Sequence, residues 1–377
     1  MIERLLERQL RSRWNSGKAL VVTGPRQVGK TTLLHKLCVE EGDYLLLNAD
    51  EADVRALLEN TSVTRLRQLI GSKKTVFVDE AQRVRNIGLT LKLITDQMPD
   101  VRLLVSGSSA LDLASEINEP LTGRKFDFHL YPISWQELVG NVGFLAAKQQ
   151  LETRLLFGFY PDVVTNVGDE RSILQQLSSS YLYKDLLTFG GIRRPEVLDK
   201  LLVVLALQVG SEVSYNELAR TIQIDKATIE TYIGLLEKAF IVFRLQPFSR
   251  NLRHEISSSR KIYFYDNGIR NAILADFKPV ALRTDIGALW ENFLISERQK
   301  VLHYGGQWAR TYFWRTHQQQ EIDYLEEKDG AIDAWEFKWN PNAKVRFAKP
   351  FIETYSPGHT TVIHRDNFDG FVTDNQP

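Results

Sequence analysis

Eight residues near the amino terminus have the types and spacing needed to hold the phosphates of a nucleotide. The segment GPRQVGKT follows the spacing G-x-x-x-x-G-K-[ST], with an apolar run before it and apolar residues at helical spacing after it. Glycines let backbone N–H groups approach phosphate oxygens, and the amino terminus of a helix favours negative charge. The predicted nucleotide-binding residues are Gly24, Pro25, Arg26, Gln27, Val28, Gly29, Lys30, Thr31 and Thr32.

Two side chains of this segment have distinct expected roles. Lys30 should reach the β- and γ-phosphates, and the hydroxyl of Thr31 should take one coordination position of a Mg²⁺ ion. The alternative is a glycine turn between a strand and a helix, with Lys30 solvated. We expect a nucleotide site because both flanking patterns are present.

Two carboxylates follow a second strand-like run. Residues 75–78 are apolar or β-branched, and Asp79 and Glu80 come directly after them. The carboxyl ends of strands in an open parallel sheet face the ligand. Asp79 should therefore hold Mg²⁺, commonly through water, and Glu80 should orient and deprotonate an attacking water. A solvated acidic pair at a strand end is the alternative.

Two more segments offer groups that could contact the γ-phosphate. The third apolar run ends in hydroxyls, and Ser106, Ser108 or Ser109 could hydrogen-bond the γ-phosphate or the attacking water, or could simply form a turn. Arg124, or else Arg26, is a candidate arginine finger, acting in its own subunit or in a neighbouring one. Such a guanidinium accelerates phosphoryl transfer by roughly 10³ to 10⁵. An ordinary ion-paired arginine is the alternative.

A second group of reactive side chains lies near the carboxyl terminus. Strand alternation puts Glu321 and Asp323 on one face, and Glu336 and Lys338 on one face of the next strand. Two carboxylates and an amine suit metal-assisted phosphodiester cleavage, with Asp323 and Glu336 as Mg²⁺ ligands. Lys338 would steer or activate water or stabilise the phosphate. A cross-strand salt bridge of Lys338 is the alternative.

The elements that position the nucleotide-binding residues, Asp79 and Glu80 are predicted to form an α/β domain. The apolar runs before each motif predict a parallel sheet of the P-loop type with helices on both faces. The first residues, MIERLLERQLRSRW, alternate charge with leucine in helical rhythm and predict an amphipathic helix that packs on this domain.

The middle of the chain predicts a helix-turn-helix followed by a wing. Ser214 with Glu217 should form a capping box for the first helix, and Asp225 should cap the second. A basic run after the second helix could follow the phosphates of a nucleic acid, or could be a solvated or interdomain face. Its basic residues are Arg244, Arg250, Arg253, Arg260 and Lys261, opposed by Glu255 alone.

Composition limits the partners and the compartment. The 377 residues predict two or three domains with sizeable cores, and the formal net charge of zero requires any nucleic-acid contact to come from a local patch. The single cysteine, Cys38, excludes an internal disulfide and fits a reducing cytoplasm. No apolar run reaches the length of a membrane span, and the amino terminus lacks the apolar stretch of a signal peptide.

The ordered segments GPRQVGKTT, VFVDEAQ, LLVSGSSA and LTGRKFDFHLYPISWQE resemble a known family. They are similar to the first domain of prokaryotic AAA-like ATP-binding proteins, which are related to the archaeal ATPases and the STAND switches. In that family a winged helix and a nuclease-like region follow, the latter of the type called domain of unknown function 4143. The resemblance implies that the nucleotide is ATP and that it is hydrolysed.

The carboxyl-terminal acids also resemble a nuclease pattern. Asp323, Glu336 and Lys338, with the helix residue Glu291 as a further metal ligand, are similar to the PD-(D/E)XK set. No Pro-Asp pair precedes the first acid, since Glu321-Ile322 stands before Asp323. Many members of that fold are inactive scaffolds, so the pattern leaves nuclease activity open.

These patterns together predict three domains and a helical bridge between the first two. They are an AAA-like P-loop ATPase over 1–145, a helical bridge over 146–195, a winged helix over 196–280 and a small restriction-endonuclease-like α/β domain over 281–377. We expect an ATP-hydrolysing switch with Mg²⁺ that acts on DNA or RNA in the cytoplasm, without membrane contact. The alternative is a STAND-like signalling protein with an inactive nuclease-like scaffold. A homo-oligomer is compatible with either and is required if Arg124 acts in trans.

Overall fold

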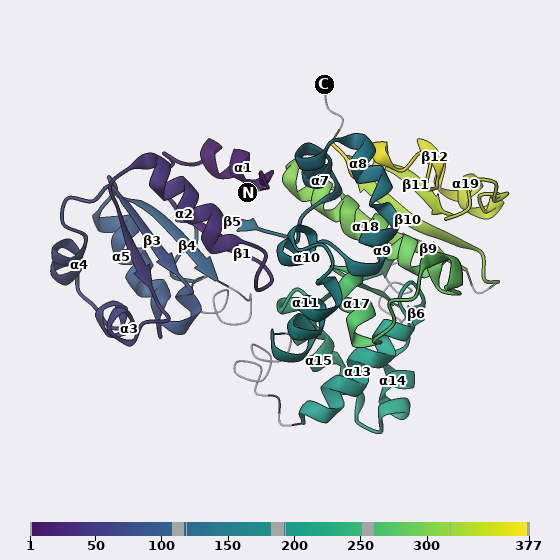
Figure 1. The fold of residues 1–377 in the computed structure, drawn as a ribbon, viewed down its shortest axis with the longest axis horizontal. Coiled ribbons are helices and arrows are strands. Elements are labelled where there is room, and N and C mark those ends of the chain that lie inside the picture. The colour runs from purple at the N-terminus through teal and green to yellow at the C-terminus, as the bar shows by residue number, and fades with distance from the viewer. Residues whose placement is uncertain are drawn as a thin grey trace. The chain divides into compact units, whose positions relative to one another are not determined.

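The chain folds into two compact units. The computed structural model describes residues 2–107, 117, 119–181, 192, 194–250, 260–316 and 318–374. The amino-terminal unit comprises the chain up to Ile133 together with Lys238–Phe240, and the carboxyl-terminal unit contains most of the chain from Ser134 onward (Figure 1). Among the described residues, no helix combines the length and the apolar composition needed to cross a bilayer.

A five-stranded parallel sheet forms the centre of the amino-terminal unit. The strand order is β2-β3-β4-β1-β5, and every adjacent pair is parallel. The strands are β1 (Ala19–Thr23), β2 (Tyr44–Asn48), β3 (Thr75–Asp79), β4 (Arg102–Gly107) and β5 (Lys125–His129). The inner strands β1, β3 and β4 correspond to apolar runs in the sequence, because a strand covered on both faces needs apolar residues at consecutive positions, whereas the edge strand β5, KFDFH, alternates polar and apolar residues.

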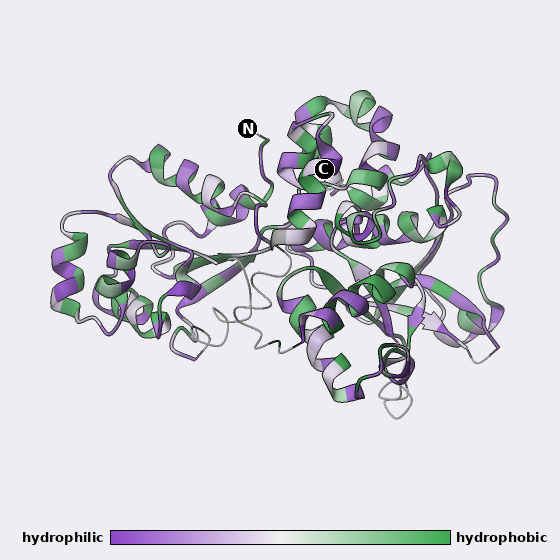
Figure 2. Cartoon of the chain, turned by 60° about the horizontal axis from the view of Figure 1, so that its bottom comes forward, coloured by the Kyte–Doolittle hydropathy of each residue, from purple (hydrophilic) through white to green (hydrophobic). Residues whose placement is uncertain are grey.

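Helices cover both faces of this sheet, as the sequence predicted. They are α1 (Leu6–Ser12), α2 (Lys30–Glu41), α3 (Ala52–Leu58), α4 (Val63–Ile70), the 3₁₀ turn η1 (Ala81–Arg83) and α5 (Ile87–Gln97). Residues of α3, α4 and α5 share one buried cluster with alternate strand residues such as Val21, Val76 and Val105. Helix α2 contacts β2, β3 and β4, and α1 contacts β5. The helices alternate hydrophobic and hydrophilic residues along the chain (Figure 2).

The carboxyl-terminal unit is a mixed seven-stranded sheet surrounded by helices. Its strand order is β12-β11-β10-β9-β7-β8-β6. The strands are β6 (Glu212–Val213), β7 (Val242–Pro247), β8 (Arg260–Phe264), β9 (Arg310–Arg315), β10 (Glu321–Lys328), β11 (Ala331–Phe337) and β12 (His359–Ile363). The helices before β6 are α7 (Trp135–Val142), α8 (Phe144–Gln149), α9 (Leu151–Phe157), α10 (Pro161–Thr165), α11 (Glu170–Gln176), the π turn η2 (Leu177–Tyr181) and α13 (Pro195–Leu207). Those after β6 are α14 (Tyr215–Ile222), α15 (Lys226–Lys238), α17 (Asn267–Ile273), the 3₁₀ turn η3 (Val280–Leu282), α18 (Ile286–Tyr304), α19 (Lys349–Tyr355) and α20 (Asp369–Val372).

The units differ from the predicted domain boundaries in two places. The segments 196–280 and 281–377 share one sheet, because β7 pairs in parallel with β9 through Gln246 and Pro247. The boundary after the first domain lies near Ser134 and not near residue 145. Trp135 explains the second difference, since its fully buried ring contacts Phe293 and its backbone N–H donates to Glu297 at 2.6 Å.

The two helices predicted in the middle segment are present as α14 and α15. Asp225 caps α15, because its Oδ1 accepts from the backbone N–H of Thr228 at 2.8 Å. The predicted capping box on α14 is wrong, since the Ser214 side chain makes no capping hydrogen bond. Strand β6 precedes these helices in the sequence and β7 follows them, and both strands pair antiparallel with β8.

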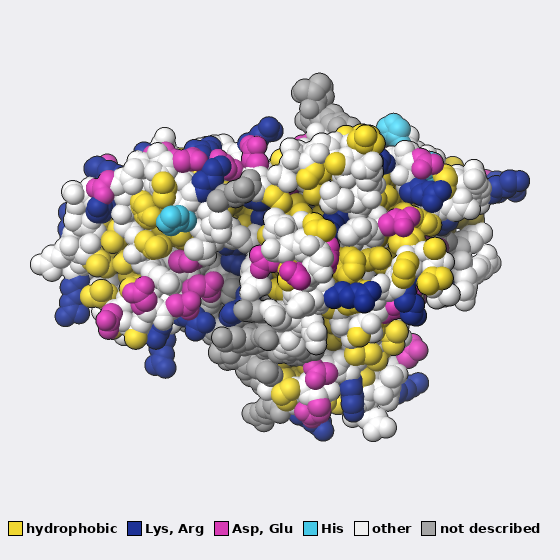
Figure 3. All heavy atoms as spheres, in the orientation of Figure 1, with side chains coloured by type: hydrophobic (Ala, Val, Ile, Leu, Met, Phe, Trp, Pro, Cys, Tyr) yellow, Lys and Arg dark blue, Asp and Glu magenta, His cyan; other side chains and the backbone are white. Residues whose placement is uncertain are grey.

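Charged side chains of both signs are interspersed on the face of the molecule shown in Figure 3. This distribution agrees with the formal net charge of zero. A mixed surface gives little long-range steering of a polyanion, because neighbouring opposite charges cancel beyond about one Debye length, roughly 10 Å.

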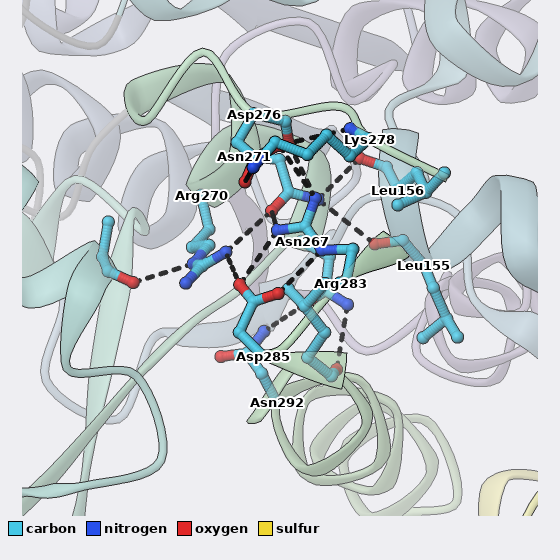
Figure 4. Close-up of polar contacts among 12 residues, drawn as sticks. Leu155, Leu156, Asn267, Arg270, Asn271, Asp276, Lys278, Arg283, Asp285 and Asn292 are labelled. Carbon is cyan, nitrogen blue, oxygen red and sulfur yellow. Dashed lines mark hydrogen bonds and ion pairs between the residues drawn. The ribbon is translucent and has the colours of Figure 1, made fainter. Parts of the chain in front are cut away.

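A buried polar network fastens α17 inside the carboxyl-terminal unit (Figure 4). Arg270 donates to the carbonyl of Ala206 at 2.8 Å and to Asp285 at 2.6 Å. Arg283 also donates to Asp285, at 2.8 Å, so that two buried guanidinium groups share one carboxylate. Burial raises the pKa of Asp285, but hydrogen bonds from Arg283 and Arg270 outweigh it and hold this pKa below the ordinary value.

We predict that Asp285→Asn destabilises the protein at neutral pH by about 2 kcal/mol. Breaking a fully buried pair costs about 3–5 kcal/mol, and 30% of the Asp285 side chain is exposed. The lowered pKa contributes stability above the ordinary value of 3.8 that is lost as pH falls through the folded-state pKa. Urea unfolding of wild type and Asp285→Asn should therefore show a difference in the free energy of unfolding at pH 7, and this difference should become smaller below pH 3.8. Glu353→Gln, in an exposed pair with Lys349, is the control and should cost less than about 0.5 kcal/mol.

Candidate functional site

The predicted phosphate loop lies between β1 and α2, and its backbone needs residues that tolerate positive φ. Gly24 has φ +151°, and a Cβ atom at this position would lie 2.2 Å from the carbonyl oxygen of Leu130. Gly29, at the amino terminus of α2, has φ +92°, and Gln27 has φ +59°. Only glycine fits the close approach at position 24, so the first residue of the motif is fixed by geometry.

Of the two side chains with predicted roles, Lys30 contacts the loop and Thr31 contacts Asp79 at the end of β3. The Lys30 ammonium is buried and donates to the carbonyl oxygens of Gly24 at 3.0 Å and Pro25 at 2.6 Å. The Thr31 hydroxyl donates to Oδ1 of Asp79 at 3.1 Å, which links the loop to the end of β3. Thr32 lies in the first turn of α2.

Residues at the ends of β3 and β4 form the rest of this site. Ser106, fully buried at the end of β4, donates to Asp79 Oδ1 and accepts from the backbone N–H of Glu80 at 3.2 Å. Glu80 has φ +52° and ψ +41°, a left-handed conformation that is strained for glutamate. Its carboxylate accepts from Gln82 Nε2 at 2.5 Å. Sequence reasoning missed Gln82, although its place two residues after Glu80 in DEAQ could have indicated the contact.

The arrangement fits a nucleoside triphosphate with Mg²⁺. The α2 amino terminus supplies N–H groups and the positive end of a helix dipole, and Lys30 supplies a cation. Thr31 and Asp79 place a hydroxyl and a carboxylate side by side, and such oxygen ligands suit Mg²⁺. Glu80 lies one residue beyond, where a carboxylate could contact an attacking water.

Arg124 does not lie at this edge of the sheet. Its carbonyl accepts from the backbone N–H of Ala19 at 2.9 Å, so Arg124 adjoins the start of β1, whereas the loop follows the end of β1. Five residues of strand separate the two edges by about 16 Å. The guanidinium also pairs with Asp96 at 2.5 Å. Of the two alternatives for Arg124, the position at the far edge of the sheet favours action from a neighbouring subunit or an ordinary ion pair.

The remaining candidates of the amino-terminal unit divide into two groups. Arg26 lies in the loop itself and is half-buried. Ser108 and Ser109 lie outside the described residues.

The second predicted group is brought together at the β10–β11 hairpin. The Lys338 ammonium contacts Glu336 Oε2 at 3.0 Å and Asp323 Oδ2 at 3.4 Å. The backbone N–H of Phe337 also donates to Asp323 Oδ2, at 2.8 Å. Both carboxylates are buried, and burial, followed by the charge of Asp323, raises the pKa of Glu336 to about 7. The proximity predicted from strand alternation is confirmed.

Glu291 is held by other partners. Its Oε1 accepts from Lys261 at 2.9 Å and from the Tyr263 hydroxyl at 2.6 Å, and Lys261 also pairs with Glu321. Among the residues that the structure describes, no group of three or more acidic, histidine or cysteine side chains is arranged to hold a metal ion. The predicted metal set of Asp323, Glu336 and Glu291 is therefore not assembled.

The basic run of the predicted wing is largely used inside the unit. Lys261 is 1% exposed, and Arg244 donates to Glu237 at 2.7 Å, so neither presents a free charge to a polyanion. Arg260 lies over the ring of Tyr215 and Arg250 lies over that of Tyr355. Arg253 and Glu255 lie outside the described residues. The basic surface expected from the sequence is thus reduced by at least two residues.

Three family models match successive parts of the chain. Residues 16–139 match a family described as AAA domain. Residues 148–279 and 286–375 match two domains of unknown function, DUF8612 and DUF4143. The first match covers the phosphate loop, Asp79 and Glu80, and the last covers Asp323, Glu336 and Lys338.

Two relatives and one solved structure are similar to the chain. An uncharacterized protein of Mycobacterium tuberculosis is 28% identical over 337 residues, which are 88% of this chain and 72% of that protein. An uncharacterized protein of Haemophilus influenzae is 24% identical over 279 residues, 66% of this chain and 68% of that protein. A Walker-type ATPase of Pyrococcus abyssi aligns with a TM-score of 0.51 and 15% identity over 73% of this chain and 96% of its own. The chain therefore shares the α/β fold of a Walker-type ATPase.

We predict that Lys261→Met destabilises the protein by about 3 kcal/mol, because it leaves Glu291 and Glu321 without their buried counter-charge. The double variant Lys261→Met, Glu291→Gln should lose less than the sum of the two single variants. Urea unfolding followed by tryptophan fluorescence measures all three, with the exposed Arg250→Ala as the control. Additive losses would mean that the Lys261–Glu291 contact does not form.

Proposed function

We propose that this protein is a Mg²⁺-dependent ATPase whose nucleotide state controls its carboxyl-terminal unit. The observation that carries the proposal is the hydrogen bond from Thr31 to Asp79, which sets the phosphate loop beside the carboxylates at the strand ends. The match of residues 16–139 to an AAA domain supports it. ATP is the nucleotide that this family match suggests.

The residues of the loop would each perform one task. The backbone N–H groups at the start of α2 and the Lys30 ammonium would bind the phosphates, and Thr31 and Asp79 would hold the metal. Bound Mg²⁺ supplies positive charge to the β- and γ-phosphate oxygens. Glu80 would take the proton of the attacking water, while Gln82 keeps one Glu80 oxygen in place. Ser106 would fix the Asp79 carboxylate and the Glu80 backbone relative to each other, because its hydroxyl hydrogen-bonds to both.

For the carboxyl-terminal unit, we propose action on DNA or RNA. The order α13, β6, α14, α15, β7, β8 has the elements of a winged helix-turn-helix. The cluster of Asp323, Glu336 and Lys338 has the composition of a restriction-endonuclease-like site. We propose that this unit binds nucleic acid. Mg²⁺-dependent cleavage at the cluster is the more specific form of the same proposal.

A second candidate is an ATP-dependent signalling protein of the STAND type with an inactive scaffold. The observation that favours it is the pairing of acids with lysines in the carboxyl-terminal unit. Lys338 contacts both acids of the cluster, and Lys261 pairs with Glu291. Carboxylates that are already neutralised by ammonium groups attract a divalent cation less strongly.

We expect Lys30→Ala and Glu80→Gln each to lower the rate of ATP hydrolysis at least tenfold. Lys30→Ala removes a cation from the phosphates, whereas Glu80→Gln removes the proton acceptor and should leave ATP binding intact. Phosphate release assays and calorimetry with MgATP measure the two effects. Lys74→Ala, an exposed lysine just before β3, is the control and should hydrolyse ATP at the wild-type rate. Unchanged hydrolysis in both site variants would refute the assignment.

If nucleic acid is the target, single-stranded or duplex DNA or RNA should raise ATP turnover severalfold, and this increase should fall steeply with salt. Asp323→Ala or Glu336→Ala should then abolish any Mg²⁺-dependent cleavage seen on a gel while leaving basal ATP hydrolysis unchanged. Glu327→Ala, on the same strand β10 but outside the cluster, is the control. ATP turnover that is indifferent to every nucleic acid tested would favour the signalling protein.

A further inference from the structure

A side chain from outside the sequence motif holds the phosphate loop. Arg4 precedes α1, and its guanidinium is buried, with the residue 8% exposed. One guanidinium nitrogen donates to the carbonyl of Val28 at 2.6 Å, and another donates to the carbonyl of Tyr131 at 2.6 Å. We propose that Arg4 is a positioning residue of the nucleotide site, which orients a backbone donor of the loop. This inference rests on the proposed binding of ATP.

The contact to Val28 fixes one peptide plane. In a trans peptide the C=O and the following N–H point in opposite directions. Arg4 therefore directs the N–H of Gly29 away from itself by holding the Val28 carbonyl. A Cβ atom at Gly29 would lie 3.8 Å from the same guanidinium nitrogen, so the cation lies directly against this part of the loop. With φ of +92°, Gly29 has access to backbone conformations that other residues avoid, and a tether limits them.

The contact to Tyr131 gives the tether a rigid anchor. Residues 130 and 131 follow β5, which pairs with β1. The carbonyl of Leu130 packs against Gly24, and its N–H donates to the carbonyl of Thr23 at 2.8 Å. The beginning of the loop thus rests on Leu130, and Arg4 ties its fifth residue, Val28, to Tyr131. The segment Leu130–Tyr131 therefore positions both ends of the loop.

The helix that follows Arg4 packs on the unit that contains the loop. Leu6 and Leu10 of α1 are fully buried. Glu7 accepts from Lys36 of α2 at 2.8 Å, and Arg11 pairs with Glu40 of α2. Burial alone would raise the pKa of Glu7, but the hydrogen bonds from Lys36 and Arg11 lower it. Because α1 is attached to the helix whose first turn would hold the phosphates, Arg4 is presented from a fixed position.

Only arginine suits this task. Its planar guanidinium has donors on separate nitrogens and can reach two carbonyls at once, whereas a lysine ammonium is a compact point donor. Arg4→Lys should therefore keep the charge and lose one of the two contacts. Arg4→Ala should lose both.

The test compares MgATP binding and hydrolysis in wild type, Arg4→Ala, Arg4→Lys and Arg8→Ala. Arg8→Ala is the matched control, because it removes an exposed arginine of α1, the helix that follows Arg4. We expect the Kd and the KM for MgATP to rise at least tenfold in Arg4→Ala, to rise less in Arg4→Lys, and to change less than twofold in Arg8→Ala. Melting temperatures without nucleotide report any general loss of stability.

Hydrogen exchange of the loop peptide in the nucleotide-free proteins separates the possible failures. We expect faster exchange in Arg4→Ala and Arg4→Lys but not in Arg8→Ala. If wild type binds no MgATP, the proposed function fails, and the exchange result still decides whether Arg4 orders the loop. If wild type binds MgATP and the Kd is unchanged in Arg4→Ala, the inference about Arg4 is overturned. Should Arg4→Ala not fold, an unchanged Kd in Arg4→Lys overturns it equally.

Discussion

One carboxylate oxygen links the elements of the candidate nucleotide site. Oδ1 of Asp79 accepts hydrogen bonds from Thr31 at the start of α2 and from Ser106 at the end of β4. Strands β1 and β3 are not neighbours, because β4 lies between them, so no direct backbone ladder joins the strand before the loop to the strand that precedes Glu80. Asp79 is 6% exposed, and these hydrogen bonds offset the cost of burying its charge. The relative positions of Lys30 and Glu80 depend on this oxygen.

The local parts of the structure could be predicted from the sequence. The phosphate loop is contiguous, so the spacing of Gly24, Gly29 and Lys30 could be recognised directly, and the two glycines lie where φ is positive. The cluster of Asp323, Glu336 and Lys338 could also be predicted, because a single turn joins its two strands and alternation determines which side chains share a face. In both cases the residues that meet are close in sequence or lie in one hairpin.

Contacts between distant segments could not be predicted in the same way. The Arg4 guanidinium meets the carbonyl of Tyr131 across 127 positions of the chain, and Lys261 meets Glu291 across 30. Lys261 looked like one member of an exposed basic run, since nothing local shows that its strand is covered by α18. Arg124 looked suitable by type, but the end of the sheet at which it lies depends on the strand pairing. These errors arise from tertiary placement and not from residue chemistry.

The three lysines of the two candidate sites lie in different electrostatic surroundings, and this difference bears on their chemistry. Lys30 donates to backbone carbonyls, which carry no net charge, so turning its ammonium towards a phosphate would separate no ion pair at these contacts. Lys261 and Lys338 contact carboxylates, and moving either ammonium away would leave buried negative charge behind. An anionic ligand at the acidic cluster would therefore have to draw an ammonium away from its carboxylates, a cost that the two carbonyl contacts of Lys30 do not impose.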